Sequence, residues 1–480
     1  MRRLGSPLEA ERGGERTAAV GCVAGSAIAT AGSWLRFSLA HTPAIDTHTW
    51  SYVLGSALAG MGLVLAGVCA LRLAPRAGRL SGRCLWATAL GSHGAALLAL
   101  PLTSTDVFTC LSYGALQRAG LSPYTHPPAA LGSAPITALV PERWAHSPTP
   151  YGPLFHPLVR AAAWAGARLG SPVWGSLFAY KLILLVAMLA ALALAAQHLR
   201  ATRAPAEAAE TFALLALNPL LTWEVVGQGH NDGLLFLALV AFVVLARRGR
   251  STWAVIALTA GVAVKYTLAP LLGLYLVLLA RRSIARALAL GALALALVGL
   301  AFLPEGRGVT LSAVLPMVGG ESARHAHSLT DLVCLVLEGL SLPRLSFAAY
   351  RLLSLASALV CAALLLGAGL HSRSVEELAH RYLLFLLGLF LTVPWFQPWY
   401  VIWALPLLLA LPDRRWRFFL ALFAVVTVSQ WAVPLDPVTT VLGDTWAAWQ
   451  AWRLAGGTSP GNGSRRRIGE ERPCGYTASP

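Results

Sequence analysis

One acidic residue beside a long apolar run has the position of a catalytic group. The run 95–102 leads into Ser104-Thr105-Asp106-Val107-Phe108, at the start of a polar segment, 103–172. A carboxylate at the mouth of a membrane span is costly unless it is used or paired. Asp106 is therefore predicted to be a general base that accepts the proton of an attacking hydroxyl group. The alternative is that it caps an interfacial helix over 107–119, and the two interpretations are compatible.

Two tyrosines in the same polar segment lie between prolines and glycines. They occur in Leu121-Ser122-Pro123-Tyr124 and in Thr149-Pro150-Tyr151-Gly152-Pro153-Leu154. Pro and Gly set turns, and tyrosine offers a sugar a flat ring and a hydroxyl group. Tyr124 and Tyr151 are therefore candidate substrate-binding residues, and the alternative is that both pack inside the loop.

A dense polar stretch separates two later apolar runs. Trp223-Glu224 leads into Gly227-Gln228-Gly229-His230-Asn231-Asp232-Gly233. Polar groups are expensive in lipid and are usually functional there. His230, Asn231 and Asp232 are predicted to bind hydroxyl groups of a sugar or an acceptor. In the alternative, Asn231 and Asp232 cap the following helix and Glu224 pairs internally.

Isolated cations offer sites for a phosphate group. Lys265, one of only two lysines, lies between apolar runs, where it could neutralise a phosphate or snorkel toward lipid headgroups. Arg324 and His325, in the loop 304–346, are candidate phosphate contacts unless this loop is merely solvated. His325 and His327 alone are weak evidence for a metal, so no metal or cofactor is expected.

An aromatic motif near the end of the chain completes the candidate set. In Gln397-Pro398-Trp399-Tyr400, the residues Gln397, Trp399 and Tyr400 are predicted to bind substrate. The alternative is the ordinary aromatic belt of a membrane protein.

The elements that must position these residues are membrane-spanning helices. The chain is 56% hydrophobic and 12% charged, with a mean hydropathy of +0.64, whereas soluble domains carry about 25% charged residues. The composition predicts an all-α polytopic membrane protein. Helices are expected at 18–40, 51–71, 85–102, 173–197, 211–228, 232–246, 252–264, 267–280, 284–303, 347–370, 378–394, 399–412 and 417–434. The pair 252–264 and 267–280 could instead be one kinked helix.

Arginines predict the orientation. They supply nearly all of the positive charge in a chain with a net charge of +16, and they fall on one side if 252–264 and 267–280 are separate passes. Arginine-rich segments between membrane helices face the cytoplasm and are attracted to anionic lipid. Nucleic acid is therefore not an expected partner. The candidate residues then gather on the extracytoplasmic face of the cell membrane.

The predicted organisation is one transmembrane domain with two short ends. Residues 1–17 form a cytoplasmic N-terminal segment, 18–434 the transmembrane domain with outer loops 103–172 and 304–346, and 435–480 a tail whose composition is typical of disorder. The seven cysteines have no metal-ligand spacing, although a Cys110–Cys334 disulfide is conceivable.

These motifs together resemble a known family. The strings around Asp106, Tyr124 and Tyr151 are similar to the first large outer loop of the polyprenol-phosphate-mannose-dependent α-1,6-mannosyltransferases. Gly229-His230-Asn231-Asp232, Val264-Lys265 and Gln397-Pro398-Trp399-Tyr400 follow in the order of that family. The resemblance spans roughly 100–410 and implies a GT-C glycosyltransferase fold of about 13 transmembrane helices with large extracytoplasmic loops.

The resemblance also implies a reaction. A mannosyl residue would move, with inversion, from a polyprenyl-phosphate donor to an extracytoplasmic glycan or glycolipid, with Asp106 as the base. Many members carry a second acid near the catalytic one, and Asp106 has none, which speaks against metal assistance. Two alternatives stay open: a GT-C enzyme for another lipid-linked sugar such as glucose or arabinose, and a lipid-sugar transporter or flippase, which a buried Glu224 would suit.

Overall fold

The computed structural model describes residues 7–40, 50–102, 104–305, 328–393 and 396–432. Within these ranges the chain forms helices and no strand, which confirms the prediction of an all-α polytopic membrane protein. Five described helices are long and apolar enough to cross a membrane by themselves, and they contain Gly13–Arg36, Leu54–Arg79, Trp174–Thr202, Ile284–Phe302 and Arg344–His371.

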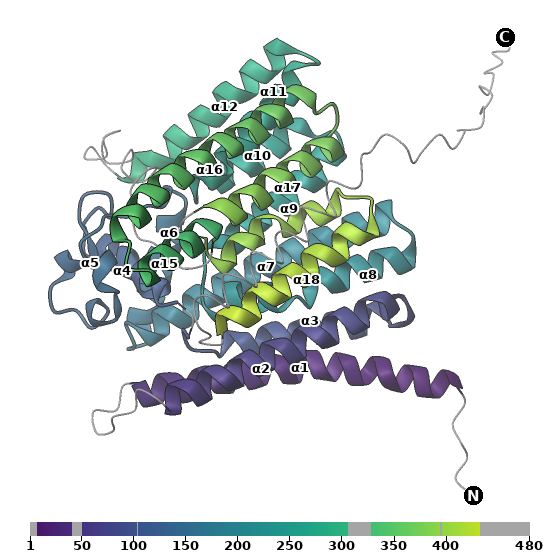
Figure 1. Cartoon of the computed structure of the whole chain (residues 1–480), viewed down its shortest axis with the longest axis horizontal. Helices are drawn as coiled ribbons and strands as arrows, with labels where there is room; N and C mark the ends of the chain where they lie inside the picture. The colour runs from purple at the N-terminus through teal and green to yellow at the C-terminus, as the bar shows by residue number, and fades with distance from the viewer. Residues whose placement is uncertain (1–6, 41–49, 103, 306–327, 394–395, 433–480) are drawn as a thin grey trace, which may run out of the picture.

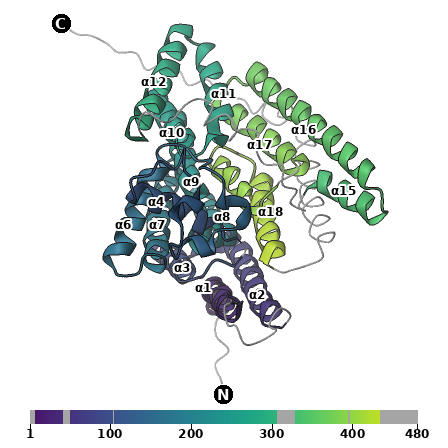
Figure 2. The ribbon, with the colours of Figure 1, turned by 90° about the vertical axis from the view of Figure 1, so that its left-hand side faces the viewer.

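The helices form a layered bundle. At one edge lie α1 (Pro7–Ala40), α2 (Trp50–Leu73) and α3 (Gly82–Leu97), and at the opposite edge lies α12 (Ile284–Phe302), as both views show (Figures 1 and 2). Between them are α7 (Trp174–Thr202), α8 (Pro205–Ala216), α9 (Asp232–Arg247), α10 (Ser251–Val262), α11 (Ala269–Ala280), α15 (Leu329–Gly339), α16 (Pro343–His371), α17 (Val375–Thr392) and α18 (Arg414–Ala432).

Three short helices mark one end of the bundle, which we call the loop end. They are α4 (Asp106–Arg118), α5 (Glu142–Ala145) and α6 (Phe155–Arg168), and they lie at the left of Figure 1. The opposite end, the Arg-rich end, is tied by ion pairs such as Arg247–Glu376 at 3.0 Å. Arginine clusters and the polar segment 103–172 therefore lie at opposite ends.

The segment 251–280 is two antiparallel helices rather than one kinked helix. Arg286, at the start of α12, donates a hydrogen bond to Ser251 at the start of α10 (2.7 Å), and α11 ends at Ala280, only six residues before Arg286. Both helices therefore have one end among the arginines, and the break between them, which carries Lys265, faces the other way. Each has 12 residues, or about 18 Å.

The α-helices predicted over 211–228 and 399–412 do not form as continuous α-helices, and prolines explain both differences. The run 211–228 is interrupted after α8, because the residue before Pro219 disfavours helix; the chain resumes as a π-helical turn, η4 (Leu221–Gly227). The run 399–412 forms two 3₁₀ segments, η7 (Pro398–Trp403) and η8 (Leu405–Leu409), each with a proline in its first turn. Proline lacks the N–H that a continuous α-helix requires.

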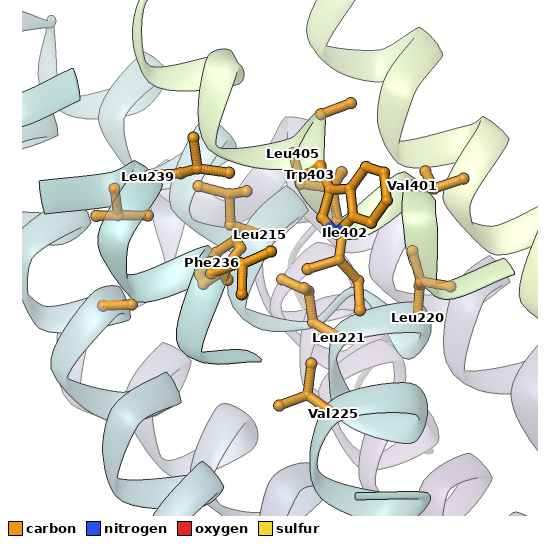
Figure 3. Packing of buried hydrophobic residues seen from close by; sticks show 14 of the residues in the cluster. Leu215, Leu220, Leu221, Val225, Phe236, Leu239, Val401, Ile402, Trp403 and Leu405 are labelled. Carbon is orange, nitrogen blue, oxygen red and sulfur yellow. The ribbon is translucent and has the colours of Figure 1, made fainter. Parts of the chain in front are cut away.

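These irregular segments pack into the centre of the apolar core. Figure 3 shows Leu221 of η4 beside Ile402 of η7, and Val225 of η4, Trp403 of η7 and Phe236 of α9 belong to the same cluster. All five side chains are buried. Irregular backbone is tolerated at membrane depth only where protein surrounds it, and here the core does so.

Candidate active site

Asp106 is the first residue of α4. Its backbone N–H donates to Ser104 Oγ (3.1 Å), and its carboxylate sits where the helix dipole favours negative charge. The Asp106 side chain is 20% exposed, and its Oδ1 atom lies 3.5 Å from Nη2 of Arg143. The expected helix after Asp106 forms, while the acid itself keeps a partly accessible carboxylate.

Arg143 is a site residue that the sequence did not reveal. It lies on α5, it is 46% exposed, and its guanidinium also stacks over Trp144 at 5.5 Å. In the sequence it follows Glu142 in a polar loop and looks like any surface charge. No local signal could have paired it with an acid 37 positions away.

A second carboxylate, Asp232, forms a tightly held cluster at the start of α9. Lys265 Nζ donates to both of its oxygens (3.1 and 3.2 Å), and Trp403 Nε1 donates to Oδ1 at 2.6 Å. Lys265 also lies 5.6 Å from the Tyr400 ring and 5.5 Å from the Trp403 ring, within cation–π range. Asp232 therefore has three donated hydrogen bonds and is buried.

His230 lies against a third carboxylate, that of Glu224, beside this cluster. Its ring stacks on Trp399 with centroids 3.8 Å apart, and its Nε2 atom lies 3.3 Å from Oε2 of Glu224. Glu224 is fully buried in η4. The Asp232–Lys265 pair and the Glu224–His230 contact thus both pack against one aromatic run, 399–403.

Close backbone contacts bring these groups together. Gly229 has φ +81°, and a Cβ there would come within 2.7 Å of Val107 Cγ2. The turn at Gly229, just before His230, therefore packs directly against Val107, the residue after Asp106. Gly152 and Leu154 donate to the carbonyls of Val264 and Ala263 (2.9 and 2.8 Å). The loop containing Tyr151 is therefore fastened beside Lys265.

Three predicted binding residues keep buried polar atoms that have no hydrogen-bond partner within the described chain, and one of them is His230, through Nε2. The other two are Asn231 Nδ2 and Gln397 Oε1, in residues that are 3% and 7% exposed. Buried polar groups are nearly always hydrogen-bonded. These atoms are accordingly suited to a ligand rich in hydroxyl groups.

Comparison with known proteins places this arrangement in a family. A family model described as "Alpha-(1->6)-mannopyranosyltransferase, N-terminal domain" matches residues 14–281, which is more than half of the chain. The protein belongs to this family. The resemblance of the motifs to α-1,6-mannosyltransferases is thereby confirmed.

Individual relatives share part of the sequence. The chain is 30% identical over 244 residues to "Alpha-(1->6)-mannopyranosyltransferase A" of Mycobacterium tuberculosis, which covers 49% of this chain and 43% of that protein. It is 30% identical over 155 residues to "Alpha-(1->6)-mannopyranosyltransferase B" of Corynebacterium glutamicum, covering 32% and 25%. Each match spans less than half of the relative, and no solved structure matches significantly.

The family match includes Asp106, Tyr124, Tyr151, the His230–Asp232 turn and Lys265. It ends at residue 281, so Gln397, Trp399 and Tyr400 lie beyond it, although the structure brings Trp399 onto His230. Arg324 and His325 lie outside the described residues. Among the residues that are described, no three His, Cys, Asp or Glu side chains group as metal ligands would, and Cys110 and Cys334 are free thiols.

The contacts of the two loop tyrosines favour packing. Tyr124 is buried, and its hydroxyl donates to the Tyr151 carbonyl (3.0 Å) while its ring packs on His156 and Phe302. Tyr151 packs on Phe155, and burial raises its pKa well above the usual range. Substrate contact by these tyrosines stays a prediction.

Proposed function

We propose that the protein is a membrane mannosyltransferase that uses a polyprenyl-phosphate-mannose donor and a glycan or glycolipid acceptor. Family membership and the printed names of the relatives support the mannosyl transfer. The apolar helices supply the lipid bilayer setting that a lipid-linked donor requires.

The juxtaposition of Asp106 with the Asp232–Lys265 cluster carries the proposal. The contact between Val107 and Gly229 puts a partly exposed carboxylate next to a turn that carries His230 and Asp232. A base on one side and cations on the other is the arrangement that a displacement with inversion requires.

In the proposed reaction, Asp106 is the general base. Asp106 accepts the proton of an acceptor hydroxyl as that oxygen bonds to the anomeric carbon of mannose. The bond from this carbon to the phosphate oxygen breaks, and the polyprenyl phosphate keeps the electron pair. Lys265, Arg324 and His325 are the candidate groups that face the leaving phosphate.

The remaining binding residues are assigned to the hydroxyl groups of the substrates. His230, Asn231 and Gln397 provide polar atoms, and Asp232 acts through Lys265, which it holds. Trp399 and Tyr400, with Tyr124 and Tyr151, provide aromatic surface. The Arg-rich end faces the cytoplasm, so the site opens on the extracytoplasmic side of the cell membrane.

The decisive experiment measures transfer from radiolabelled polyprenyl-phosphate-mannose to a short mannoside, by the purified full-length protein in liposomes. Asp106→Asn is expected to lower the rate about 10²- to 10⁴-fold. The control is Asp413→Asn, an acid at the Arg-rich end that accepts a hydrogen bond from the backbone N–H of Arg415 in its own turn.

Other outcomes point to the rival functions. Near-normal transfer by Asp106→Asn would refute the role of this acid. Product formed only from a glucose or arabinose donor would change the sugar. Exchange of labelled sugar-lipid across the bilayer without any glycan product would indicate a flippase.

A further inference from the structure

The connector between α3 and α4 leads to Asp106, the first residue of α4, and begins with the non-helical residues 98–102, of which 99–102 are buried. Such a segment cannot satisfy its own backbone hydrogen bonds, and unpaired backbone groups away from water are costly. Side chains from three other elements supply the partners. These hydrogen bonds hold the connector in one conformation. We call residues 98–102 the Asp106 arm, and the hydrogen bonds from Lys181 and Gln228 to it the brace.

Lys181 braces the start of the arm. It lies on α7, is 1% exposed, and is one of only two lysines in the chain. Its ammonium donates to the carbonyl oxygens of Ala96 (3.3 Å), Leu97 (2.7 Å) and Ala99 (2.6 Å). These are carbonyls at the end of α3, where a helix has no partners of its own and where a cation is favoured.

Gln228 braces the far end of the arm. Its Oε1 atom accepts from the backbone N–H of Leu102 (2.6 Å), and its Nε2 donates to the carbonyl of Leu100 (3.4 Å). Gln228 is also 1% exposed. Because it directly precedes Gly229 and His230, the same residue holds the Asp106 arm and the turn that carries Asp232.

The N-terminal helix supplies partners for two further backbone groups of this segment. Ser33 Oγ accepts from the Leu100 N–H (3.0 Å), and Trp34 Nε1 donates to the Leu98 carbonyl (2.8 Å). The arm is thus held from α1, from α7 and from the turn after η4. Lys181 also lies beneath Gly229, since a Cβ on that glycine would be 3.8 Å from Lys181 Cγ.

We propose that Lys181 and Gln228 are positioning residues that set the separation between Asp106 and the His230–Asp232 turn. Neither would touch the substrates. Both act by fixing where the carboxylate stands relative to the donor side of the site. This inference rests on the proposed role of Asp106 as the base.

The kinetic test uses Lys181→Met, which keeps the bulk and removes the three donated hydrogen bonds, and Gln228→Leu. Each is expected to lower kcat about 10- to 100-fold, since a small misplacement of a reacting group has an effect of this size, with donor and acceptor KM within about threefold. Gln228→Glu keeps the acceptor for Leu102 N–H and should lose less than Gln228→Leu. Met188→Ala, a buried change on the same helix, is the control for packing damage.

A double-mutant comparison separates positioning from general damage. In the Asp106→Asn background, Lys181→Met should lower the residual rate no further, because its effect passes through Asp106. The same fold-loss in both backgrounds would overturn the proposal, as would an unchanged kcat or a loss confined to KM. If Lys181→Met does not fold, the same comparison with Gln228→Leu decides.

A measurement without catalysis keeps this inference apart from the proposed function. Amide hydrogen exchange of the peptide covering 98–106 should become at least tenfold faster in Lys181→Met and Gln228→Leu, and remain unchanged in Met188→Ala. Unchanged exchange would overturn the brace. A wild-type protein that shows this protection but transfers no sugar would refute the proposed function and leave the brace intact.

Discussion

The two aspartates of the site are held in opposite ways. Asp232 is 1% exposed, bonded twice to Lys265 and once to Trp403. Asp106 is 20% exposed, and its Oδ1 atom lies 3.5 Å from a half-exposed Arg143, a separation too long for a strong hydrogen bond. One carboxylate is built into the core, and the other is partly exposed and has an oxygen, Oδ1, with no hydrogen-bond partner in the described chain.

This difference separates a structural acid from a chemical one. A buried acid with three donors cannot accept a further proton without losing those bonds, and removing its partner leaves an uncompensated charge. An acid in a loose, half-exposed pair can exchange its partner for a hydroxyl group at little cost. The contrast favours Asp106 as the base and gives Asp232 the task of holding Lys265.

The largest expected effect is on stability. Asp232→Ala leaves the Lys265 ammonium and the Trp403 N–H without their acceptor, and should lower the free energy of unfolding by about 3–5 kcal/mol. Thermal unfolding in detergent, followed by tryptophan fluorescence, measures this. Asp106→Ala is the matched control, with an expected loss below about 1 kcal/mol; equal losses would erase the contrast between the two acids.

A paired replacement sharpens the role of Lys265. Lys265→Met alone should destabilise by about 2–4 kcal/mol, because Asp232 stays buried and charged, whereas Lys265→Met with Asp232→Leu should recover most of that loss. Unfolding midpoints of the three variants test this. If the stable double variant still transfers no sugar, the Lys265–Asp232 pair takes part in the transfer; transfer at the wild-type rate would restrict both residues to a structural role.

Arg143 should matter far less. An exposed ion pair contributes about 0.2–1 kcal/mol, so Arg143→Gln should change both the unfolding free energy and the transfer rate by no more than this, or about fivefold in rate. Steady-state kinetics and the same unfolding assay measure it. A hundredfold loss of rate would show that Arg143 takes part in the chemistry.

The smallest effect concerns Cys110, one turn after Asp106 on α4. Burial raises the pKa of its thiol to about 12, and the nearby Asp106 charge acts in the same direction, although a hydrogen bond from Tyr151 opposes it. At pH 8 only about one thiol in 10⁴ is then ionised. Cys110 should resist N-ethylmaleimide in the folded protein, with the partly exposed Cys84 as the labelled reference. Rapid labelling of Cys110 at pH 8 would mean that α4 unfolds locally and exposes this thiol, which would contradict the prediction.

Much of the candidate site could be predicted because its signals are local. A carboxylate, a histidine or a lysine among apolar residues is conspicuous in a membrane protein, and Asp106, His230, Asp232 and Lys265 stand out in this way. Pro219 and Pro398 are also visible in the sequence. The π-helical and 3₁₀ conformations that follow them depend on the packing around them.

The amino-acid sequence by itself determined the class of protein, the polar residues at one end and the arginines at the other, because composition and hydropathy act through local transfer between water and lipid. Only the tertiary structure decided which charges meet. Trp403 reaches Asp232 across 171 positions, and Lys181 reaches Leu97 across 84. Such pairs are set by how distant helices pack. Asp106 and Asp232 therefore differ in the neighbours that the fold gives them, and not in anything that their local sequence shows.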